Sequence, residues 1–372
     1  IMGELGLDGG VQDIPGALPI AELASSEGLS GCILPLGSAL EALEYSSIDV
    51  YAVERLEDVL HILSGEEASD MLIRNRIDEV ARPEVPTQDS SVMDFSEIIG
   101  QEGAKRGLEI AAAGGHNAIL IGSPGSGKSS LAKAMSTILP PLNFQESLQT
   151  SKIYSVAGKG NPLGGLMKHR PFRAPHYSAS IAALLGGGSD NIMPGEISLA
   201  HNGILFIDEF CEAPKKVLEV LRAPMEDRKV TISRLKTKVE YPADFMMVAA
   251  ANPCPCGYFG HPARKCTCTD KQVASYLSKI SGPLLDRIDL HIEVAPVEYS
   301  DLSSKANEEN SQTIRERIAK VREIQQKRFE GTEITCNAQI TPALLQKFCP
   351  LDDEASTMLE NAFNKMGLSA RA

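Results

Sequence analysis

Several residue types that support particular functions are scarce or missing in this sequence. Tryptophan is absent and aromatic residues make up 5% of the 372 residues, which leaves no stacking platform for reading specific bases. No apolar run reaches the length of about 20 residues that a membrane-spanning helix needs. The first residues also lack the basic start and long apolar stretch of a signal peptide. We therefore expect a cytoplasmic protein without a membrane partner.

Charge of one sign is scarce in one stretch of the chain and missing from another. Residues 1–93 hold 18 Asp and Glu, four Arg and no Lys, so the net charge of −13 originates in this part. Residues 153–188, by contrast, contain no Asp or Glu. The acidic total argues against a wholly basic nucleic-acid binder, but it leaves the rest of the chain free to carry local basic patches.

Cysteine is also sparse, because eight residues are too few for a disulfide scaffold in a chain of this length. Four of them form two closely spaced pairs, Cys254 with Cys256 and Cys266 with Cys268. Four thiolates could hold one Zn²⁺ tetrahedrally and staple a loop that is too polar to pack alone. The usual zinc knuckle has two residues between its cysteines, so free thiols and disulfides are the alternatives.

Hydrophobic patterning divides the chain into four parts. Near the N-terminus, short apolar strands alternate with helical stretches, which predicts a small α/β domain. A polar run containing Pro83 and Pro86 offers nothing to bury and blocks helices, so it is typical of a linker. Because Ile1 precedes the first Met, we expect the chain to come from a longer gene product. The expected parts are a small α/β domain at 1–64, a linker at 65–93, a larger core at 94–298 and a truncated helical lid at 299–372.

The larger core has the pattern of an α/β domain with a parallel sheet. A helix is expected at residues 95–113, followed by a buried strand at 116–121 and a second helix at 128–139. Continuous apolar runs, typical of central parallel strands, occur at 203–207 and 245–250, and a weaker one at 290–294.

A glycine-rich segment after the first core strand fits the P-loop pattern in full. Such glycines let backbone N–H groups curl around phosphates at a helix N-terminus, where the helix dipole favours anions. Lys128 would reach the outer phosphates, and the Ser129 hydroxyl can bind Mg²⁺. The residues expected to bind ATP are Gly122, Ser123, Pro124, Gly125, Ser126, Gly127, Lys128, Ser129 and Ser130.

Two acids follow the next apolar strand, about 80 residues after the P-loop. Asp208 would hold Mg²⁺, directly or through water, and Glu209 would act as the general base that polarises the attacking water. Phosphoryl transfer depends mostly on positioning and charge neutralisation, so a metal-holding acid beside a water-orienting acid is the expected equipment.

Three further residues are candidates for contact with the γ-phosphate or the water. Asn252 ends the strand at 245–250 and would help to orient the water, although a polar residue in this position is often only a turn signal. Arg287 and Arg371 could each stabilise charge on the γ-phosphate. The alternative for each arginine is a surface ion pair. If Arg287 acts from a neighbouring subunit, the enzyme must be a ring.

Two basic segments could contact DNA. The acid-free insert contains Arg170 and Arg173, and such an insert in a ring's pore could follow a phosphate backbone. Residues 228–241 have the pattern of a hairpin whose tip carries Arg234 and Lys236. A solvated charged surface is the alternative for both segments.

These motifs together resemble the magnesium-chelatase-related AAA+ ATPases, most nearly their ComM/YifB type. The resemblance extends over nearly the whole chain and includes residues 170–176, 186–188, 194–196 and 252–257. It implies a P-loop AAA+ core with a helical lid, a homohexameric ring, and branch migration of DNA during recombination and natural transformation. It also places a pore insert in the acid-free segment.

The N-terminal residues 3–11 resemble part of the Lon-protease domain, a small α/β (S5-like) unit. In that family a lysine follows shortly and acts with a serine, but here no Lys occurs before residue 105. We therefore interpret this part as a partial Lon-protease-like domain without peptidase chemistry.

Two functional hypotheses follow. In the first, ATP hydrolysis drives a DNA-translocating motor; in the second, a chelatase-type ATPase remodels a protein partner without touching DNA. The basic hairpin and insert distinguish them, because a protein partner would not need arginines in a pore. A scaffold without turnover is disfavoured because Asp208 and Glu209 are both present.

Overall fold

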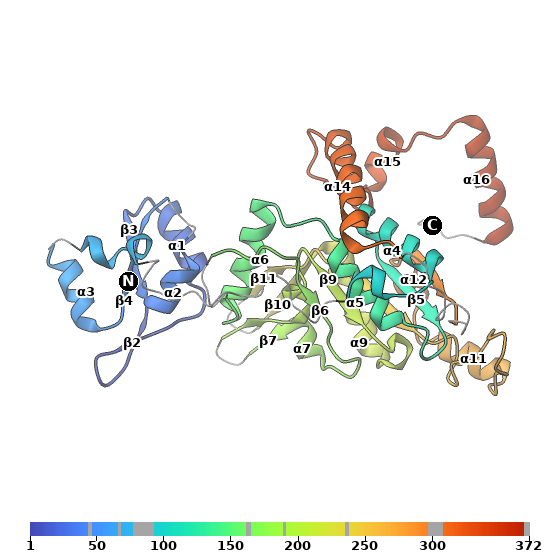
Figure 1. Ribbon diagram of the computed structural model, residues 1–372, viewed down its shortest axis with the longest axis horizontal. Coiled ribbons are helices and arrows are strands. Elements are labelled where there is room, and N and C mark those ends of the chain that lie inside the picture. Colours follow the sequence, from blue (N-terminus) through green and yellow to red (C-terminus); the bar gives the residue numbers. More distant parts are fainter. Residues whose placement is uncertain are drawn as a thin grey trace.

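The computed structural model describes residues 1–43, 47–65, 68–76, 93–160, 165–188, 191–234, 238–296 and 308–367. A small N-terminal domain lies at one end of the molecule and the larger α/β core follows it (Figure 1). The C-terminal helices lie beside the core, away from the N-terminal domain.

The core is built on a five-stranded parallel sheet in the order β13-β5-β12-β9-β6. Its central strands are almost entirely apolar and buried on both faces, as expected for parallel strands covered by helices. The strands are β5 (Ala118–Gly122), β6 (Phe172–Arg173), β9 (Ile204–Ile207), β12 (Met246–Ala251) and β13 (Leu290–Val294).

Helices cover both faces of this sheet. One face packs against α4 (Glu102–Gly114), α5 (Lys128–Ile138) and α14 (Ser311–Arg328), whose apolar residues share one core cluster with β5 and β12. The other face packs mainly against short helices. These are α7 (Ile181–Leu185), α8 (Glu196–Leu199), α9 (Lys215–Val220), α10 (Arg222–Asp227), α11 (Asp270–Leu277) and α12 (Gly282–Leu285).

One expectation for the core was wrong, and one strand was not expected. The helix expected at 95–113 is broken, because Asp94 caps a single 3₁₀ turn at Phe95–Glu97 and the left-handed Gly100 and Gln101 precede α4. The insert also contributes a strand to the sheet, since β6 pairs with β9 at the edge. Only two residues long and preceded by Pro171, β6 has too short a pattern to be seen in the sequence.

Two β-hairpins pack against the core. β10 (Lys229–Ser233) and β11 (Lys238–Pro242) pair antiparallel, which confirms the hairpin expected at 228–241. β7 (Gly186–Gly187) and β8 (Met193–Pro194) form a second, shorter pair. Tyr241 donates a hydrogen bond to the Ile192 carbonyl over 2.6 Å, so the two hairpins lie against each other.

The N-terminal domain is a small α/β unit, as its pattern predicted. β3 (Gly31–Pro35) and β4 (Asp49–Val53) pair parallel and bury their apolar residues under the helices. Part of the expected linker, residues 68–76, packs in two 3₁₀ turns near β4, and residues 77–92 lie outside the described residues. The remaining elements are β1 (Glu4–Leu5), β2 (Val11–Gln12), α1 (Ala17–Ser26), α2 (Leu36–Glu41) and α3 (Leu56–Leu63).

The N-terminal domain is anchored on α6 (Phe144–Val156) of the core. Lys152 forms an ion pair with Glu22 at 2.9 Å, and the Ser155 hydroxyl donates a hydrogen bond to Glu41. Burial raises the pKa of Glu41, and the Ser155 hydrogen bond partly opposes this shift. The domain therefore meets the core through a specific, partly buried polar contact.

The C-terminal part is helical, as expected. α14 joins the core through Ile314 and Ile318, and α15 (Pro342–Phe348) and α16 (Asp353–Met366) follow it. No helix in the described ranges combines the length and hydropathy needed to cross a membrane.

Candidate active site

The P-loop joins the end of β5 to the start of α5. Gly125 and Gly127 have φ angles of 79° and 91°, a left-handed conformation that glycine adopts without strain. Space is open beside both glycines, and no side chain caps the first turn of α5. The free N–H groups of that turn therefore face an open cradle suited to phosphate. The hydroxyl of Ser126 is buried in this loop without a hydrogen-bond partner among the described residues.

Lys128 is the buried cation of the site. Its ammonium group donates hydrogen bonds to the carbonyls of Gly122 and Ser123, at 2.8 and 2.9 Å. Burial lowers the pKa of Lys128, while the nearby Asp208 carboxylate partly restores it. A buried ammonium held mainly by carbonyls lacks a full counter-charge, which a phosphate would supply.

Ser129 and Asp208 meet across the ends of α5 and β9. The Ser129 hydroxyl donates a hydrogen bond to Asp208 Oδ2 over 2.6 Å. A hydroxyl and a carboxylate are hard oxygen ligands, which Mg²⁺ prefers alongside phosphate oxygens and water. The two side chains therefore fit the role of Mg²⁺ ligands beside the phosphate cradle.

Glu209 follows Asp208 directly and is exposed toward solvent. Its φ of 49° is left-handed, which is uncommon for a residue with a side chain, and its N–H donates to Asp208 Oδ1 over 2.9 Å. Backbone strain of this kind concentrates at functional sites because surrounding structure must hold it. The turn separates the two carboxylates, so they have different surroundings.

Asn252 lies where β12 ends, between the strands that lead to the P-loop and to Asp208. Its Oδ1 accepts a hydrogen bond from Lys128 Nζ over 3.2 Å. The structure therefore brings together Lys128, Ser129, Asp208 and Asn252, with Glu209 beside them. The ends of neighbouring parallel strands are where open α/β sheets bind their ligands.

Arg287 does not join this group. Its backbone carbonyl accepts a hydrogen bond from the Asn117 side chain. Asn117 directly precedes β5, so it lies at the N-terminal end of this strand, whereas the P-loop follows its C-terminal end. The five residues of β5 separate its two ends by about 16 Å. The Arg287 guanidinium instead forms an ion pair with Glu226 on α10. Arg371 lies outside the described residues.

The insert arginines are engaged within the chain. Arg170 forms an ion pair with Glu146 at 2.8 Å and donates to the carbonyls of Pro140 and Asn202. Arg173 binds both oxygens of Glu196, at 2.6 and 2.7 Å, and this contact raises its pKa. In this conformation both guanidiniums hold the insert on the core and are not presented to a ligand.

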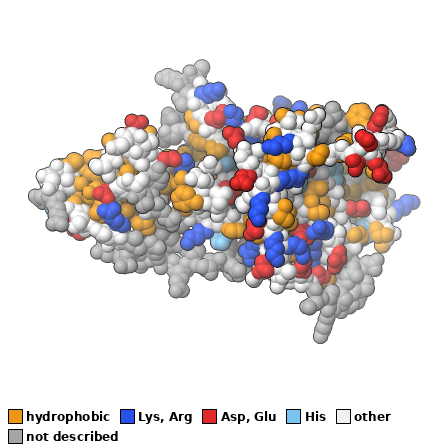
Figure 2. Space-filling model, turned by 90° about the horizontal axis from the view of Figure 1, so that it is seen from above, with side chains coloured by type: hydrophobic (Ala, Val, Ile, Leu, Met, Phe, Trp, Pro, Cys, Tyr) orange, Lys and Arg blue, Asp and Glu red, His pale blue; other side chains and the backbone are white. Residues whose placement is uncertain are grey.

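Arg234 has different surroundings at the end of β10. It is exposed and makes no ion pair with any part of the chain that the structure describes. Its guanidinium approaches Gly187 of the neighbouring hairpin, so the tip regions of the two hairpins adjoin. Lys236 lies outside the described residues. On the face shown in Figure 2, the described Lys and Arg are interspersed with Asp and Glu over the core.

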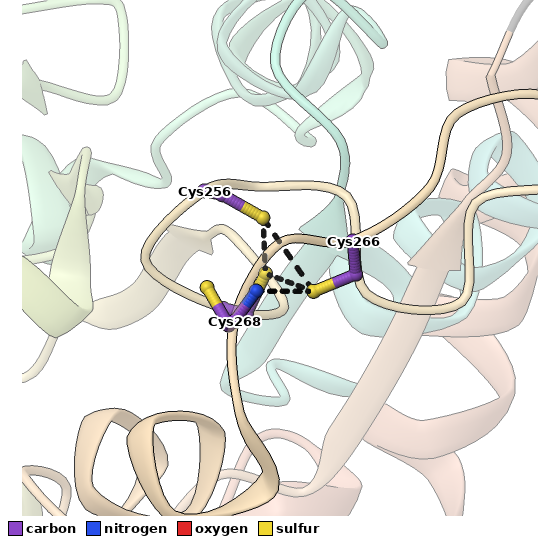
Figure 3. Close-up of side chains that lie close together, drawn as sticks. Cys256, Cys266 and Cys268 are labelled. Atoms are coloured by element: carbon purple, nitrogen blue, oxygen red, sulfur yellow. Dashed lines mark hydrogen bonds between the residues drawn. The ribbon is translucent and has the colours of Figure 1, made fainter.

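The four paired cysteines converge in the loop after Asn252. The sulfur atoms of Cys254, Cys256, Cys266 and Cys268 all lie within 4.8 Å of one another (Figure 3). Sequence reasoning identified this group, but not its position: a Cβ on Gly257 would lie 2.5 Å from Pro124 Cδ, so the loop touches the P-loop. The sequence carries no signal for this contact beyond the lack of a side chain at Gly257.

The sheet order, the P-loop after β5, the acids after β9 and the helical lid define an ATPase of the AAA+ class. ATP and Mg²⁺ are the cofactors of that class.

Comparison with known proteins identifies the family. The profile of magnesium chelatase subunit ChlI matches residues 94–302, and that of its C-terminal region matches residues 308–372. YifB of Salmonella typhimurium is 39% identical over 100% of this chain and 70% of its own length. The competence protein ComM of Haemophilus influenzae is 39% identical over 99% of this chain and 70% of its own length. The chain therefore belongs to the ComM/YifB type of magnesium-chelatase-related proteins.

A solved chain from the complex between magnesium chelatase subunits BchI and BchD is a more distant match. It has 18% identity and a TM-score of 0.41, and the match covers 73% of this chain and 75% of that chain.

Proposed function

We propose that this ATPase is a ring-forming motor that moves along DNA. The observation that carries the ATPase part of the proposal is the convergence of Lys128, Ser129, Asp208 and Asn252 at the ends of three neighbouring strands. Phosphoryl transfer needs charge neutralisation and a positioned water more than covalent chemistry, and these side chains supply both.

Each residue has a distinct role in this proposal. The P-loop, from Gly122 to Ser130, binds the phosphates through its N–H groups and Lys128. Ser129 and Asp208 hold Mg²⁺, which when bound neutralises charge on the phosphate oxygens. Glu209 accepts the proton of the attacking water and Asn252 orients that water.

The ring part of the proposal is supported by the position of Arg287. Arg287 lies near the N-terminal end of β5, whereas its own P-loop follows the C-terminal end, so Arg287 cannot reach the phosphate that its own chain binds. It can act only on a nucleotide held by a neighbouring subunit, after leaving Glu226. Arg371 is a second candidate for contact with the γ-phosphate.

The DNA part of the proposal is supported by Arg234 and by the relatives. Arg234 is an exposed cation without an intrachain acid, at the tip of a hairpin that packs on a second hairpin. With Lys236 it would contact the phosphate backbone, which requires no base recognition. The name of the Haemophilus relative, a competence protein, fits a role in handling incoming DNA, such as branch migration. Arg170 and Arg173 would join this surface only if their ion pairs open.

The second candidate is a chelatase-type ATPase that remodels a protein partner. The family profiles of magnesium chelatase and the engagement of Arg170 and Arg173 within the chain favour it. In either case we propose that residues 1–64 belong to a Lon-protease-like domain that serves assembly or regulation, because they lack the lysine of a Ser–Lys dyad.

The test is steady-state ATPase activity with and without single-stranded or branched DNA. We expect DNA to stimulate the native protein and the Arg234→Ala/Lys236→Ala variant to lose that stimulation while its basal rate stays unchanged. Arg315→Ala/Lys320→Ala is the matched control, because it removes the same two charges from the exposed side of α14. Robust turnover that is indifferent to every DNA would favour the protein-remodelling candidate instead.

A further inference from the structure

The spacing of the cysteine sulfurs is that of a metal tetrathiolate. Cys254 Sγ lies 3.3 Å from Cys256 Sγ and 3.7 Å from Cys266 Sγ, and the last two sulfurs are 3.5 Å apart. A disulfide requires about 2.05 Å. Tetrahedral zinc with Zn–S bonds of about 2.3 Å places its sulfurs about 3.8 Å apart. The observed distances therefore match the edges of a zinc site far better than a disulfide.

The backbone around the cluster is arranged to receive thiolate charge. Phe259 N–H donates to Cys254 Sγ over 3.3 Å, and Cys268 N–H donates to Cys266 Sγ over 3.4 Å. Four thiolates this close repel one another unless a cation lies between them. Four soft sulfur ligands around a space for a single ion favour Zn²⁺, with all positions filled as in a structural site.

The loop that carries the cluster has almost no core of its own. Between β12 and α11, residues 253–269 form no helix or strand, and only Cys254 and Gly257 are buried. Phe259, the large apolar residue of the loop, is 50% exposed. An ordered loop of this length needs another source of stability, which a metal clip can provide.

This loop is in direct contact with the candidate nucleotide site. Gly257, one residue after Cys256, has a φ of 82° and approaches Pro124 so closely that a side chain could not fit between them. At its other end, Cys254 follows Asn252 by two residues, and Asn252 accepts the hydrogen bond from Lys128. The cluster therefore lies next to both the P-loop and Asn252.

We propose that Cys254, Cys256, Cys266 and Cys268 bind one Zn²⁺ that braces the loop against the P-loop and thereby sets the affinity for nucleotide. The metal site stands on the cysteine geometry alone, whereas its effect on nucleotide rests on the proposed function. Loss of zinc releases the loop from Pro124 and frees Asn252.

The metal site is tested by the metal content of the full chain, without nucleotide. We expect about one zinc per chain by elemental mass spectrometry. Cys256→Ser/Cys266→Ser should lose it, and Cys349→Ser, which changes an exposed cysteine outside the cluster, should retain it. Cobalt substitution should produce the absorption bands of a tetrahedral thiolate site. Absence of metal, a disulfide between these cysteines, or equal zinc in all three proteins would overturn the site.

The bracing role is tested by the affinity for a fluorescent ATP analogue. We expect a drop of about tenfold after a chelator removes zinc, with recovery when Zn²⁺ is returned. Gly257→Ala should keep its zinc and still bind the analogue more weakly, because its methyl group displaces Pro124. This variant covers the case in which the cysteine variant does not fold.

The outcomes separate the two proposals. If zinc is present but neither its removal nor Gly257→Ala changes the affinity, the bracing role is wrong. If the zinc-loaded protein binds no nucleotide at all, the proposed function fails while the metal site stands.

Discussion

Lys128 Nζ donates a hydrogen bond to Asn252 Oδ1 over 3.2 Å, although the two residues lie 124 positions apart in the chain. The contact forms because β5 and β12 are neighbouring parallel strands with Ile121 opposite Ala251. The P-loop and Asn252 therefore follow the C-terminal ends of adjacent strands and lie close together. In our proposal, the ammonium group of Lys128 binds the incoming phosphate in place of Asn252 Oδ1. The amide of Asn252 is then free to orient the attacking water.

This relationship predicts different effects for the two partners. Lys128→Ala should weaken ATP binding about 10- to 100-fold, because it removes a charge-assisted contact to phosphate. Asn252→Ala should bind ATP within a few-fold of the native affinity but lower turnover about 100-fold, as loss of an oriented polar group does. Titration with a fluorescent ATP analogue and phosphate release measure the two quantities. Equal loss of binding in both variants would contradict the proposed division of roles.

Glu209→Gln should separate binding from hydrolysis. The amide keeps the size of the side chain but cannot accept the proton of water, so turnover should fall by about 100-fold or more at unchanged ATP affinity. Glu212→Gln, at an exposed glutamate of the same turn, is the control and should hydrolyse ATP normally. Near-normal phosphate release by Glu209→Gln would refute its assignment as the base.

Arg287 offers a test of the ring that uses two inactive proteins. Arg287→Ala and Glu209→Gln should each be nearly inactive alone. When they are mixed before assembly, about a quarter of the interfaces of a closed ring should pair an intact Glu209 with an intact Arg287. ATPase activity of the mixture should therefore rise well above that of either variant. Unchanged activity in mixed assemblies would show that Arg287 does not act on a neighbour's nucleotide.

His201 should make stability depend on pH. Burial lowers its pKa from 6.5 to about 4, with the attraction of Glu146 opposing this shift and the repulsion of Arg170 adding to it. The unfolded chain therefore binds the proton first, and the stability from a neutral His201 is lost as pH falls from about 6.5 to about 4. The loss should approach about 3 kcal/mol.

The check for His201 is the thermal midpoint between pH 7 and pH 4 in the native protein and in His201→Gln. An amide can still accept the hydrogen bond that Asp244 N–H donates to His201 Nδ1 over 3.0 Å, but it does not titrate. The variant should lose less stability than the native protein over this range. Parallel curves would mean that His201 does not control the acid response.

Local features of the chain were predictable because their physical causes are local. The P-loop requires glycines at left-handed positions next to a lysine, and the hairpin at 228–241 requires only alternation and a polar tip. Continuous apolar runs identified β9 and β12, since a strand buried on both faces has few alternatives. The helix expected at 95–113 failed for a local reason too, because the cap at Asp94 and the turn at Gly100 have no apolar signature.

Side chains that act through distant partners were predicted less well. Arg170 and Arg173 have the composition of a DNA-binding segment, but Glu146 and Glu196, more than 20 positions away, engage them in the fold. The sequence could not reveal these pairs because charge complementarity is decided by proximity in space, and proximity is set by how the insert packs on the core.

By itself, the sequence determined the kind of chemistry available: a phosphate cradle, two acids after a buried strand, an amide after another and four clustered thiols. The tertiary structure alone decided how they are combined. It placed Asn252 within hydrogen-bond distance of Lys128 and Gly257 against Pro124. It placed Arg287 at the ends of the strands opposite the P-loop. The reason is physical: residue types and short spacings fix what a segment can bind, but the order of strands in the sheet fixes which segments meet.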